Sequence, residues 1–444
     1  MSLKLHVFVN DVPVATLDSP DSFKHVMTYH DQVKPDQFVS LLMPVQTESY
    51  TYPELHPIFK MNLPEGFLLS ILKEELGPHV GASPLSLLSV VGRNAIGRVK
   101  VAPIGADPTT APVPFELAEI LKGDNSEEAF VRLVRRHAVS GVSGVVPKFL
   151  NNSIVELSKG TLATEHYIIK GTTARLPGVA LNEHLCMQVA RTAGLRTAQT
   201  QVSDDGQALI VSRFDTDAVT GNRLGMEDLC SLLALNPEQK YETTWEKVVN
   251  RIGDIILDIP QRNQALSELA DLLILTYLLR NADCHSKNIA LLYSSKSQIW
   301  LAPIYDMLTI TVYDDYHLSP PGLSLAGRKT WMPGNEFVLF MQKRCNIKPS
   351  ELQQRIESLC EAVVKVSPEL IRTAQEYPHF QEIGKRMLRT WNEGMNSLRL
   401  KKTWSLPNLS SQIEQAQFSE TAPVKKTKRA VVGRSPLLGE RRST

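Results

Sequence analysis

Three residues in the second half of the chain have the types and the spacing that phosphoryl transfer requires. Asp283 is followed five positions later by Asn288, and Asp306 closes the apolar segment Leu301–Asp306. In phosphoryl transfer from ATP, one aspartate orients or accepts the proton of the attacking hydroxyl. An asparagine and a second aspartate hold Mg²⁺ between the phosphates, because hard oxygen ligands suit this ion. The spacing predicts Asp283 as the catalytic aspartate and Asn288 and Asp306 as ligands of Mg²⁺.

The same residues have a simpler interpretation. Aspartate and asparagine are favoured in turns and at helix ends, where their side chains bond to nearby backbone groups. Asp283 and Asn288 follow an apolar, helix-like segment that ends at Arg280, so they fit a cap and a turn there. Asp306, in an apolar context further along, weakens this alternative without removing it.

Other parts of an ATP site lie upstream in a suitable order. The Gly- and Ser-rich segment Ser140–Lys148 has small residues whose backbone N–H groups can approach phosphates, although it lacks the Walker A spacing. Lys170 ends a predicted strand, His166–Lys170, from which a lysine can reach the α- and β-phosphates. Glu183, at the start of the next predicted helix, is the candidate carboxylate that holds this lysine. Taken singly, these features also fit an ordinary turn, a solvated lysine and a favourable acid in a first helical turn.

The predicted elements that position these residues are strands in the first half of the chain and helices in the second. Strands are predicted over 3–9, 12–16, 95–101, 165–170, 208–214, 289–293 and 298–302, and helices over 64–76, 180–193, 269–280, 350–366 and 381–400. Asn10-Asp11 predicts a hairpin turn, and Gly194 a helix end. The fold class is therefore predicted to be α+β.

Changes in composition divide the chain into five segments. The predicted boundaries are a mixed N-terminal domain over 1–102, a proline-rich linker over 103–114, a β-rich lobe over 115–225, a mainly helical lobe over 226–422 and a tail over 423–444. The tail carries a net charge of +6 and no aromatic residue, which predicts disorder.

Charge and cysteine content exclude several classes of protein. The 444 residues carry a formal net charge of +1, and because the tail is so basic, residues 1–422 carry −5. A protein that coats nucleic acid through its net charge is therefore excluded. The five cysteines form no C-x-x-C pair, which argues against a disulfide scaffold and fits a reducing compartment. No secretory signal and no bilayer-spanning apolar run is visible, so a cytoplasmic protein without a membrane partner is expected.

The sequence resembles HipA-type serine/threonine kinases, the toxins of HipBA toxin–antitoxin modules. The likeness extends over most of residues 1–400 and is carried by short motifs. They are FKMNLPEG (59–66), LLSVVGRNAIGRVKVAP (87–103), SGVSGVVPK (140–148), HYIIK (166–170), LNEHLCMQVARTAGL (181–195), LIVSRFD (209–215), MEDLC (226–230), RNADCHSKNIALL (280–292) and LAPIYD (301–306).

The resemblance implies a HipA-like kinase fold, ATP and Mg²⁺ as cofactors, and a role for each matching residue. Asp283 would be the catalytic aspartate, Asn288 and Asp306 would bind Mg²⁺, and Lys170 would contact ATP phosphate. The other residues implied at the ATP site are Ser143, Gly144, Val145, Val146 and Lys148 in the phosphate loop, Arg213 and Phe214 at the adenine hinge, His285 and Lys287 near the nucleotide, and Glu183 and Tyr305 as supporting residues. The chain departs from the family at Ser212, where better-known relatives carry glutamate.

The resemblance also implies regulation and partners. A serine of the phosphate loop is autophosphorylated in this family, and Ser143 matches that position best, with Ser140 as the alternative. Family members phosphorylate aminoacyl-tRNA synthetases and arrest growth. Their partner is a helix-turn-helix antitoxin of the HipB type, through which operator DNA is bound. The basic tail would add phosphate contacts to that DNA.

Two other functions compete with a toxin kinase. A kinase fold that has lost turnover would act as a co-repressor with the antitoxin, and Ser212 and the basic tail favour it. A small-molecule kinase would use the same catalytic residues, but the additional domain over 1–102 fits the toxin family better.

Overall fold

The computed structural model describes residues 3–21, 23–63, 83–109, 160–163, 166–172 and 175–416, with only the backbone of 160–163. The N-terminal module, described over 3–63 and 83–109, is built on an antiparallel sheet of order β4-β3-β2-β1-β5. Its strands are β1 (Lys4–Val9), β2 (Val12–Asp21), β3 (Lys24–Tyr29), β4 (Tyr50–Tyr52) and β5 (Val99–Pro103), and its helices are α1 (Pro57–Lys60) and α4 (Pro84–Val91).

The predicted hairpin at the N-terminus is confirmed. Asn10 and Asp11 both have positive φ (49° and 64°), as a two-residue turn between strands of right-handed twist requires. The strand predicted over 95–101 begins only at Val99. Residues 95–98 instead form a loop whose backbone contacts another part of the chain, because Gly97 N–H donates to Asp215 (2.7 Å).

A second antiparallel sheet, the middle sheet, has the order β6-β7-β9-β8. It comprises β6 (Gly160–Ala163), β7 (Tyr167–Gly171), β8 (Thr200–Val202) and β9 (Ala208–Ser212), with α7 (Val179–Thr192) between β7 and β8. The predicted strands and the predicted helix are found here within about two residues. Gly194, after α7, has φ +79°, which is the left-handed conformation that a helix end favours.

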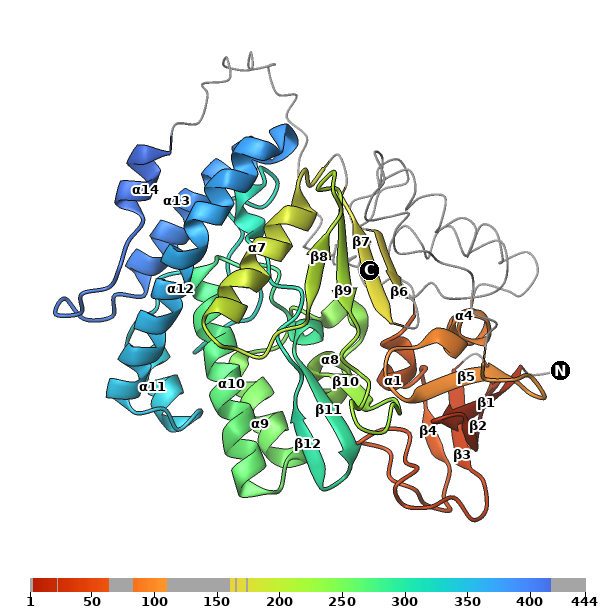
Figure 1. The fold of residues 1–444 in the computed structure, drawn as a ribbon. Helices are drawn as coiled ribbons and strands as arrows, with labels where there is room; N and C mark the ends of the chain where they lie inside the picture. Colours follow the sequence, from red (N-terminus) through yellow and green to blue (C-terminus); the bar gives the residue numbers. More distant parts are fainter. Residues whose placement is uncertain are drawn as a thin grey trace, which may run out of the picture.

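The second half of the chain is mainly helical, as predicted. It contains α8 (Leu229–Leu232), α9 (Trp245–Ile255), α10 (Ile259–Leu278), α11 (Asn335–Lys343), α12 (Pro349–Glu376), α13 (Gln381–Ser397) and α14 (Ser410–Gln415). A small sheet of order β10-β11-β12 interrupts the helices, with β10 (Gly225–Asp228), β11 (Ala290–Ser295) and β12 (Gln298–Leu301). Figure 1 shows most of these helices packed together on the side of the middle sheet away from the N-terminal module, whereas α8 lies beside α1 of that module.

Two helices are longer than predicted. α10 begins ten residues early because Asp258 caps its polar first turn, accepting from Gln261 N–H at 2.9 Å. α12 continues beyond the predicted end at residue 366 and through Pro368, although proline lacks an N–H and commonly ends or kinks a helix. Residues on both sides of this proline, Val366 and Leu370, are buried in the main core, and this packing stabilises the helix across the lost hydrogen bond.

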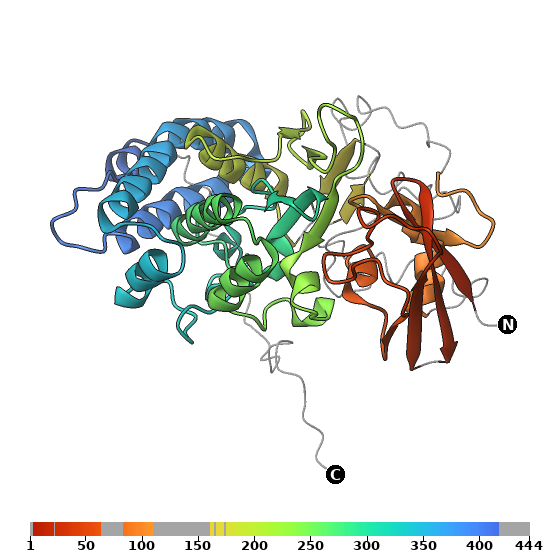
Figure 2. The same cartoon turned by 90° about the horizontal axis from the view of Figure 1, so that it is seen from below.

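Figure 2 shows the N-terminal module beside the rest of the chain, to which buried polar groups attach it. The fully buried Glu227 carboxylate accepts hydrogen bonds from Ser40 Oγ (2.6 Å), Leu41 N–H (2.7 Å) and Tyr293 OH (2.8 Å). Arg98 lies over the rings of Phe38 and Tyr293. Buried polar groups with all these partners fix one orientation of the module on the chain.

Several predictions fall on residues outside those that the structure describes. They are the helix over 64–76, the phosphate loop over 140–148, residues 110–114 of the proline-rich linker and the tail over 423–444.

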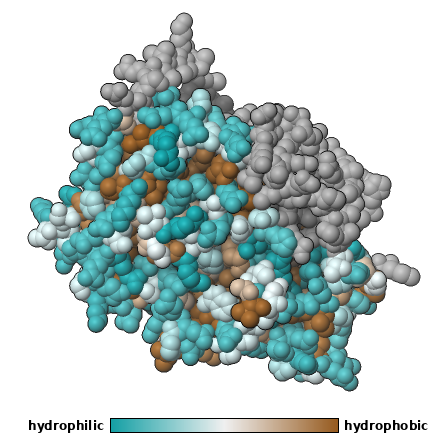
Figure 3. All heavy atoms as spheres, in the orientation of Figure 1, coloured by the Kyte–Doolittle hydropathy of each residue, from teal (hydrophilic) through white to brown (hydrophobic). Residues whose placement is uncertain are grey.

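All five cysteines are buried, and none of them forms a disulfide. Among the described residues, no helix is both long and apolar enough to cross a bilayer. The face drawn in Figure 3 is mainly hydrophilic, with small hydrophobic patches between polar groups.

Candidate active site

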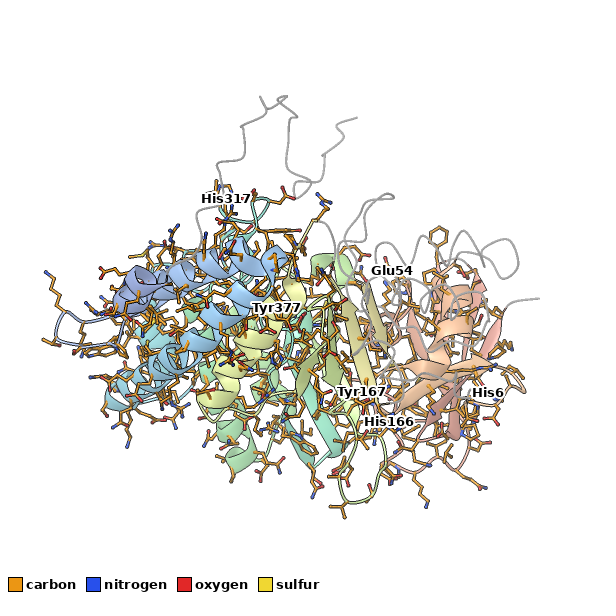
Figure 4. The ribbon with its side chains drawn as sticks, turned by 45° about the horizontal axis from the view of Figure 1, so that its top comes forward. His6, Glu54, His166, Tyr167, His317 and Tyr377 are labelled. Carbon is orange, nitrogen blue, oxygen red and sulfur yellow. The ribbon has the colours of Figure 1, made fainter. Side chains whose placement is uncertain are left out.

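A cleft of about 520 Å³ lies where the N-terminal module, the middle sheet and the helical part of the chain meet. One end is apolar and the other is charged. Its lining comprises Ile96, Ile168, Lys170, Glu183, Met187, Thr200, Val211, Arg213, Phe214, Asp215, Met226, Tyr305 and Asp306. In Figure 4, His166 and Tyr167, at the start of β7, lie between the helices on one side and the module that carries His6 on the other.

Lys170 is at the centre of the charged end. Its Nζ donates to Glu183 Oε1 and to Asp306 Oδ1, both at 2.6 Å. The side chains of the three residues are only 8%, 2% and 1% exposed. A cation that two buried carboxylates hold in this way has a fixed position, as a phosphate-binding lysine requires.

The backbone around these residues explains why they meet. Ile304 pairs with Thr197 in a parallel bridge, which places the segment before Asp306 beside the chain that leads into β8. The side-chain amide of Asn182, in α7, bonds to both the N–H (2.9 Å) and the C=O (3.1 Å) of Thr309. Asp306 itself has φ +56°, a left-handed conformation that aspartate tolerates better than most residues. The helix that carries Glu183 and the turn that carries Asp306 are thus fastened together.

The 281–288 loop follows α10 and carries Asn288 to Asp306. Asn288 Nδ2 donates to Asp306 Oδ2 at 2.6 Å, while its Oδ1 accepts from His285 N–H at 3.2 Å. Asp283 N–H donates to Asn281 Oδ1 (3.1 Å), and Asp283 Oδ1 accepts a short hydrogen bond from Tyr241 OH. Local capping therefore accounts for part of these contacts, but the bond from Asn288 to Asp306 spans 18 residues and belongs to the site.

Two other residues of this loop lie behind the cleft. His285 and Lys287 are buried, and neither lines the cleft. Burial, together with the nearby Lys240 and Lys287 charges, lowers the pKa of His285 well below its ordinary value, so its imidazole is neutral at pH 7. Burial also raises the pKa of the Cys284 thiol to about 12, which excludes this cysteine as a nucleophile.

The apolar end of the cleft is formed partly by Phe214 and Tyr305, whose ring centroids are 5.4 Å apart. Tyr305 OH donates to the backbone C=O of Lys287 (2.7 Å), so its ring is anchored to the 281–288 loop. At the hinge, Arg213 N–H donates to His166 C=O (2.8 Å), and Ser212 lies in β9. Rings of this kind offer an apolar surface against which a flat group such as a purine can stack.

Asp215 links this end of the cleft to the N-terminal module. Its carboxylate accepts from Gly97 N–H (2.7 Å) and from Arg213 Nε (2.9 Å), and Arg213 also donates to the C=O of Ala95 (3.2 Å). Burial alone would raise the pKa of Asp215, but Arg213 and Arg223 hold it below its ordinary value. The carboxylate is therefore charged at pH 7 and fastens the 95–98 loop, including Ile96, to the cleft.

Replacing Asp215 by asparagine is expected to weaken both the fold and the cleft. It leaves the buried Arg213 guanidinium without its carboxylate, which costs about 3–5 kcal/mol in the free energy of unfolding. We also expect ATP to bind about tenfold more weakly, because the 95–98 loop loses its charged anchor and Ile96, which lines the cleft, is held less firmly. Urea denaturation and an ATP titration measure the two effects. The control is Asp217→Asn in the same segment, whose side-chain oxygen can still accept from Val219 and Thr220 N–H, so its urea midpoint should stay close to that of wild type.

The oxygen atoms at the charged end fit a magnesium ion. Asp306 offers a carboxylate beside the Asn288 amide, whose nitrogen faces Asp306 here and whose oxygen would be the ligand once turned toward an ion. Mg²⁺ is usually held by one or two carboxylates together with substrate phosphates and water. Within the described residues, no group of three or more His, Cys, Asp or Glu side chains is placed to hold a metal ion. The donors thus suit an ion that arrives with a phosphorylated ligand rather than one caged by protein alone.

Three residues that contact the site were not predicted from the sequence. They are Asn182, Asp215 and Tyr241. Asn182 is a polar residue within an apolar helical pattern, which is a detectable signal, and Asp215 directly follows Arg213-Phe214. Tyr241 gives no signal, because it lies in a polar segment 42 residues before Asp283. The predicted Ser140, Ser143, Gly144, Val145, Val146 and Lys148 lie outside the described residues.

Family models match most of this architecture. The model of the HipA-like C-terminal domain matches residues 140–367, which is half of the chain, and that of the HipA N-terminal domain matches residues 5–102. The chain belongs to the HipA family. The predicted family is thereby confirmed.

Three individual relatives are each less than 30% identical to this chain. "Putative kinase Y4mE" of Sinorhizobium fredii is 28% identical over 309 residues, covering 66% of this chain and 72% of its own. "Putative kinase Y4dM" of the same organism is 26% identical over 328 residues, covering 68% and 76%. A "Putative kinase" of Haemophilus influenzae is 29% identical over 163 residues, covering 34% of this chain and 47% of its own.

A solved structure confirms the predicted fold. HipA in a complex of the Shewanella oneidensis HipA, HipB toxin–antitoxin system with operator DNA superposes with a TM-score of 0.61. The match covers 89% of this chain and 96% of that one at 17% identity. The predicted α+β class and HipA-like kinase fold are therefore correct.

Proposed function

We propose that this HipA protein is an ATP- and Mg²⁺-dependent protein serine/threonine kinase. One observation carries the proposal: Lys170, Glu183, Asp306 and Asn288 form one connected cluster at the charged end of a cleft whose other end is apolar. This polarity matches a nucleotide, with the base at the apolar end and the phosphates at Lys170. The names of the relatives as kinases support the same reaction.

Each residue has a defined part in the reaction. Lys170, held by Glu183 and Asp306, binds phosphate oxygens and neutralises their charge. Asp306 and Asn288 would hold Mg²⁺, which supplies further neutralisation when bound. Asp283 orients the hydroxyl of a serine or threonine and accepts its proton. A new O–P bond forms to the γ-phosphorus as its bond to the β–γ bridging oxygen breaks, and ADP leaves.

We further propose that the enzyme is the toxin of a two-gene module. The HipA protein of Shewanella oneidensis is found with HipB and operator DNA, and this chain matches 96% of its length. A HipB-like antitoxin is therefore the proposed partner, with operator DNA bound mainly through it. A component of translation, such as an aminoacyl-tRNA synthetase, is the proposed target, and Ser143 or Ser140 the proposed autophosphorylation site.

The test is phosphate transfer by the purified full chain. Wild type, incubated with γ-labelled ATP and Mg²⁺, should label itself and a protein in a bacterial extract. Mass spectrometry then locates the label on Ser143, Ser140 or elsewhere, and phosphoproteomics after induction identifies the target. If wild type labels neither itself nor any protein, the kinase proposal is wrong. Label found only on a metabolite indicates a small-molecule kinase, and ATP binding without transfer indicates a co-repressor.

A further inference from the structure

Tyr241 contacts the proposed catalytic aspartate directly. It lies in the segment between α8 and α9, just after the short helix η2 (Pro237–Gln239), and its hydroxyl donates to Asp283 Oδ1. We propose that Tyr241 is a positioning residue, which holds one oxygen of Asp283 so that the other faces the incoming hydroxyl. This inference rests on the proposed kinase function and names a residue to which neither the sequence nor the comparisons assign a role.

The two oxygens of the Asp283 carboxylate have different surroundings. Oδ1 accepts from Tyr241, whereas Oδ2 accepts no hydrogen bond from any described residue. A carboxylate held on one side cannot turn about its last bond, so its second oxygen keeps one direction. Fixing a reacting group in this way lowers the entropy that must be lost on reaching the transition state.

Tyr241 is itself fixed on several sides. The backbone C=O of the preceding Lys240 accepts from both N–H (3.2 Å) and Oγ (2.9 Å) of Ser286, a residue of the 281–288 loop. Lys329 Nζ donates to the C=O of Tyr241 (3.2 Å). The Tyr241 ring packs edge-on against His285, with centroids 4.9 Å apart. The hydroxyl and the aspartate therefore belong to one rigid unit, although they are 42 residues apart in the sequence.

The hydroxyl of Tyr241 also keeps its proton. Burial and the negative charge of Asp283 raise the pKa of Tyr241 well above its ordinary value. The phenol is therefore neutral throughout the working range of an enzyme and always donates to the carboxylate. To compete with Asp283 for the proton of the substrate hydroxyl, Tyr241 would first have to lose its own proton. Its raised pKa prevents this.

The test is Tyr241→Phe in the full chain, which removes the hydroxyl and leaves the ring on His285. Loss of one hydrogen bond to a charged group predicts a fall in kcat of about 10- to 100-fold. The KM for ATP should change less than twofold, because Tyr241 does not line the cleft. The thermal midpoint should also stay within about two degrees of wild type. The matched control is Tyr277→Phe, a buried tyrosine of α10 packed on Trp331 and Phe337, which should keep wild-type kcat.

The outcomes separate this inference from the proposed function. If wild type is active and Tyr241→Phe has the same kcat, the inference is wrong and the proposed kinase function stands. A variant in which kcat, ATP affinity and thermal midpoint fall together shows a merely structural tyrosine and also overturns it. A wild type without phosphate transfer overturns the proposed function, and the inference with it.

Discussion

The Asp283→Asn variant is expected to transfer phosphate about 10²- to 10⁴-fold more slowly than wild type, because an amide cannot accept the proton of the attacking hydroxyl. The fold should be unaffected, since the asparagine occupies the same volume and its side-chain oxygen can still accept from Tyr241. ATP should bind as to wild type, because Asp283 does not line the cleft. Single-turnover kinetics with labelled ATP measure the rate, and a thermal-shift titration measures ATP binding.

The matched control for this variant is Asp254→Asn, the same chemical change at an exposed position of α9. It should transfer phosphate at the wild-type rate. If Asp283→Asn is as active as wild type, another residue takes the proton and the assignment of Asp283 is wrong. In cells, the inactive variant should also relieve any growth arrest that wild type causes.

The Lys170→Met variant is expected to lose both activity and stability. Methionine fills much of the same space but cannot bind phosphate, so transfer should fall by at least about 100-fold. It also leaves the carboxylates of Glu183 and Asp306, 2% and 1% exposed, without their shared cation. Removing one partner of a buried ion pair costs about 3–5 kcal/mol in the free energy of unfolding, which urea denaturation measures.

A double variant distinguishes the electrostatic cause from a packing defect. In Lys170→Met/Glu183→Gln, one unpaired carboxylate remains instead of two, so about half of the lost stability should return, while phosphate transfer stays low. If the double variant is less stable than Lys170→Met, packing rather than charge causes the loss. The control is Lys100→Met, whose ion pair with Asp11 is partly exposed (21% and 47%) and should contribute less than about 1 kcal/mol.

Local sequence patterns were sufficient to predict most of the helices and strands. The alternation in 3–9 and the turn residues Asn10-Asp11 act within a few positions, and so does the glycine that follows α7. The errors arose where packing overrode a local signal. Pro368 should end a helix, yet α12 continues because its buried face is held by the core. Residues 95–98 were predicted as part of the strand that continues to 101, yet they form the loop that Asp215 holds.

For the candidate site too, short spacings in the sequence indicated some residues, whereas other contacts depend on packing. Asp283, Asn288 and Asp306 lie within 24 residues of one another, on a loop and a turn joined by a strand pair, so their spacing alone indicated phosphoryl transfer. Their order with Lys170 and Glu183 suggested a kinase. The motifs around them identified the HipA family, which the family models confirm.

The sequence by itself therefore determined the family and the fold class, and it named the candidate site residues, because these depend on residue type and on short spacings. Only the tertiary structure decided which of them meet. Lys170 reaches Asp306 across 136 positions, Gly97 reaches Asp215 across 118, and Tyr241 reaches Asp283 across 42. Such contacts leave no periodic trace in a sequence, because they depend on how whole elements pack in three dimensions. For the same reason, the sequence does not reveal that His285 and Lys287, which lie close to Asp283 in the chain, are buried.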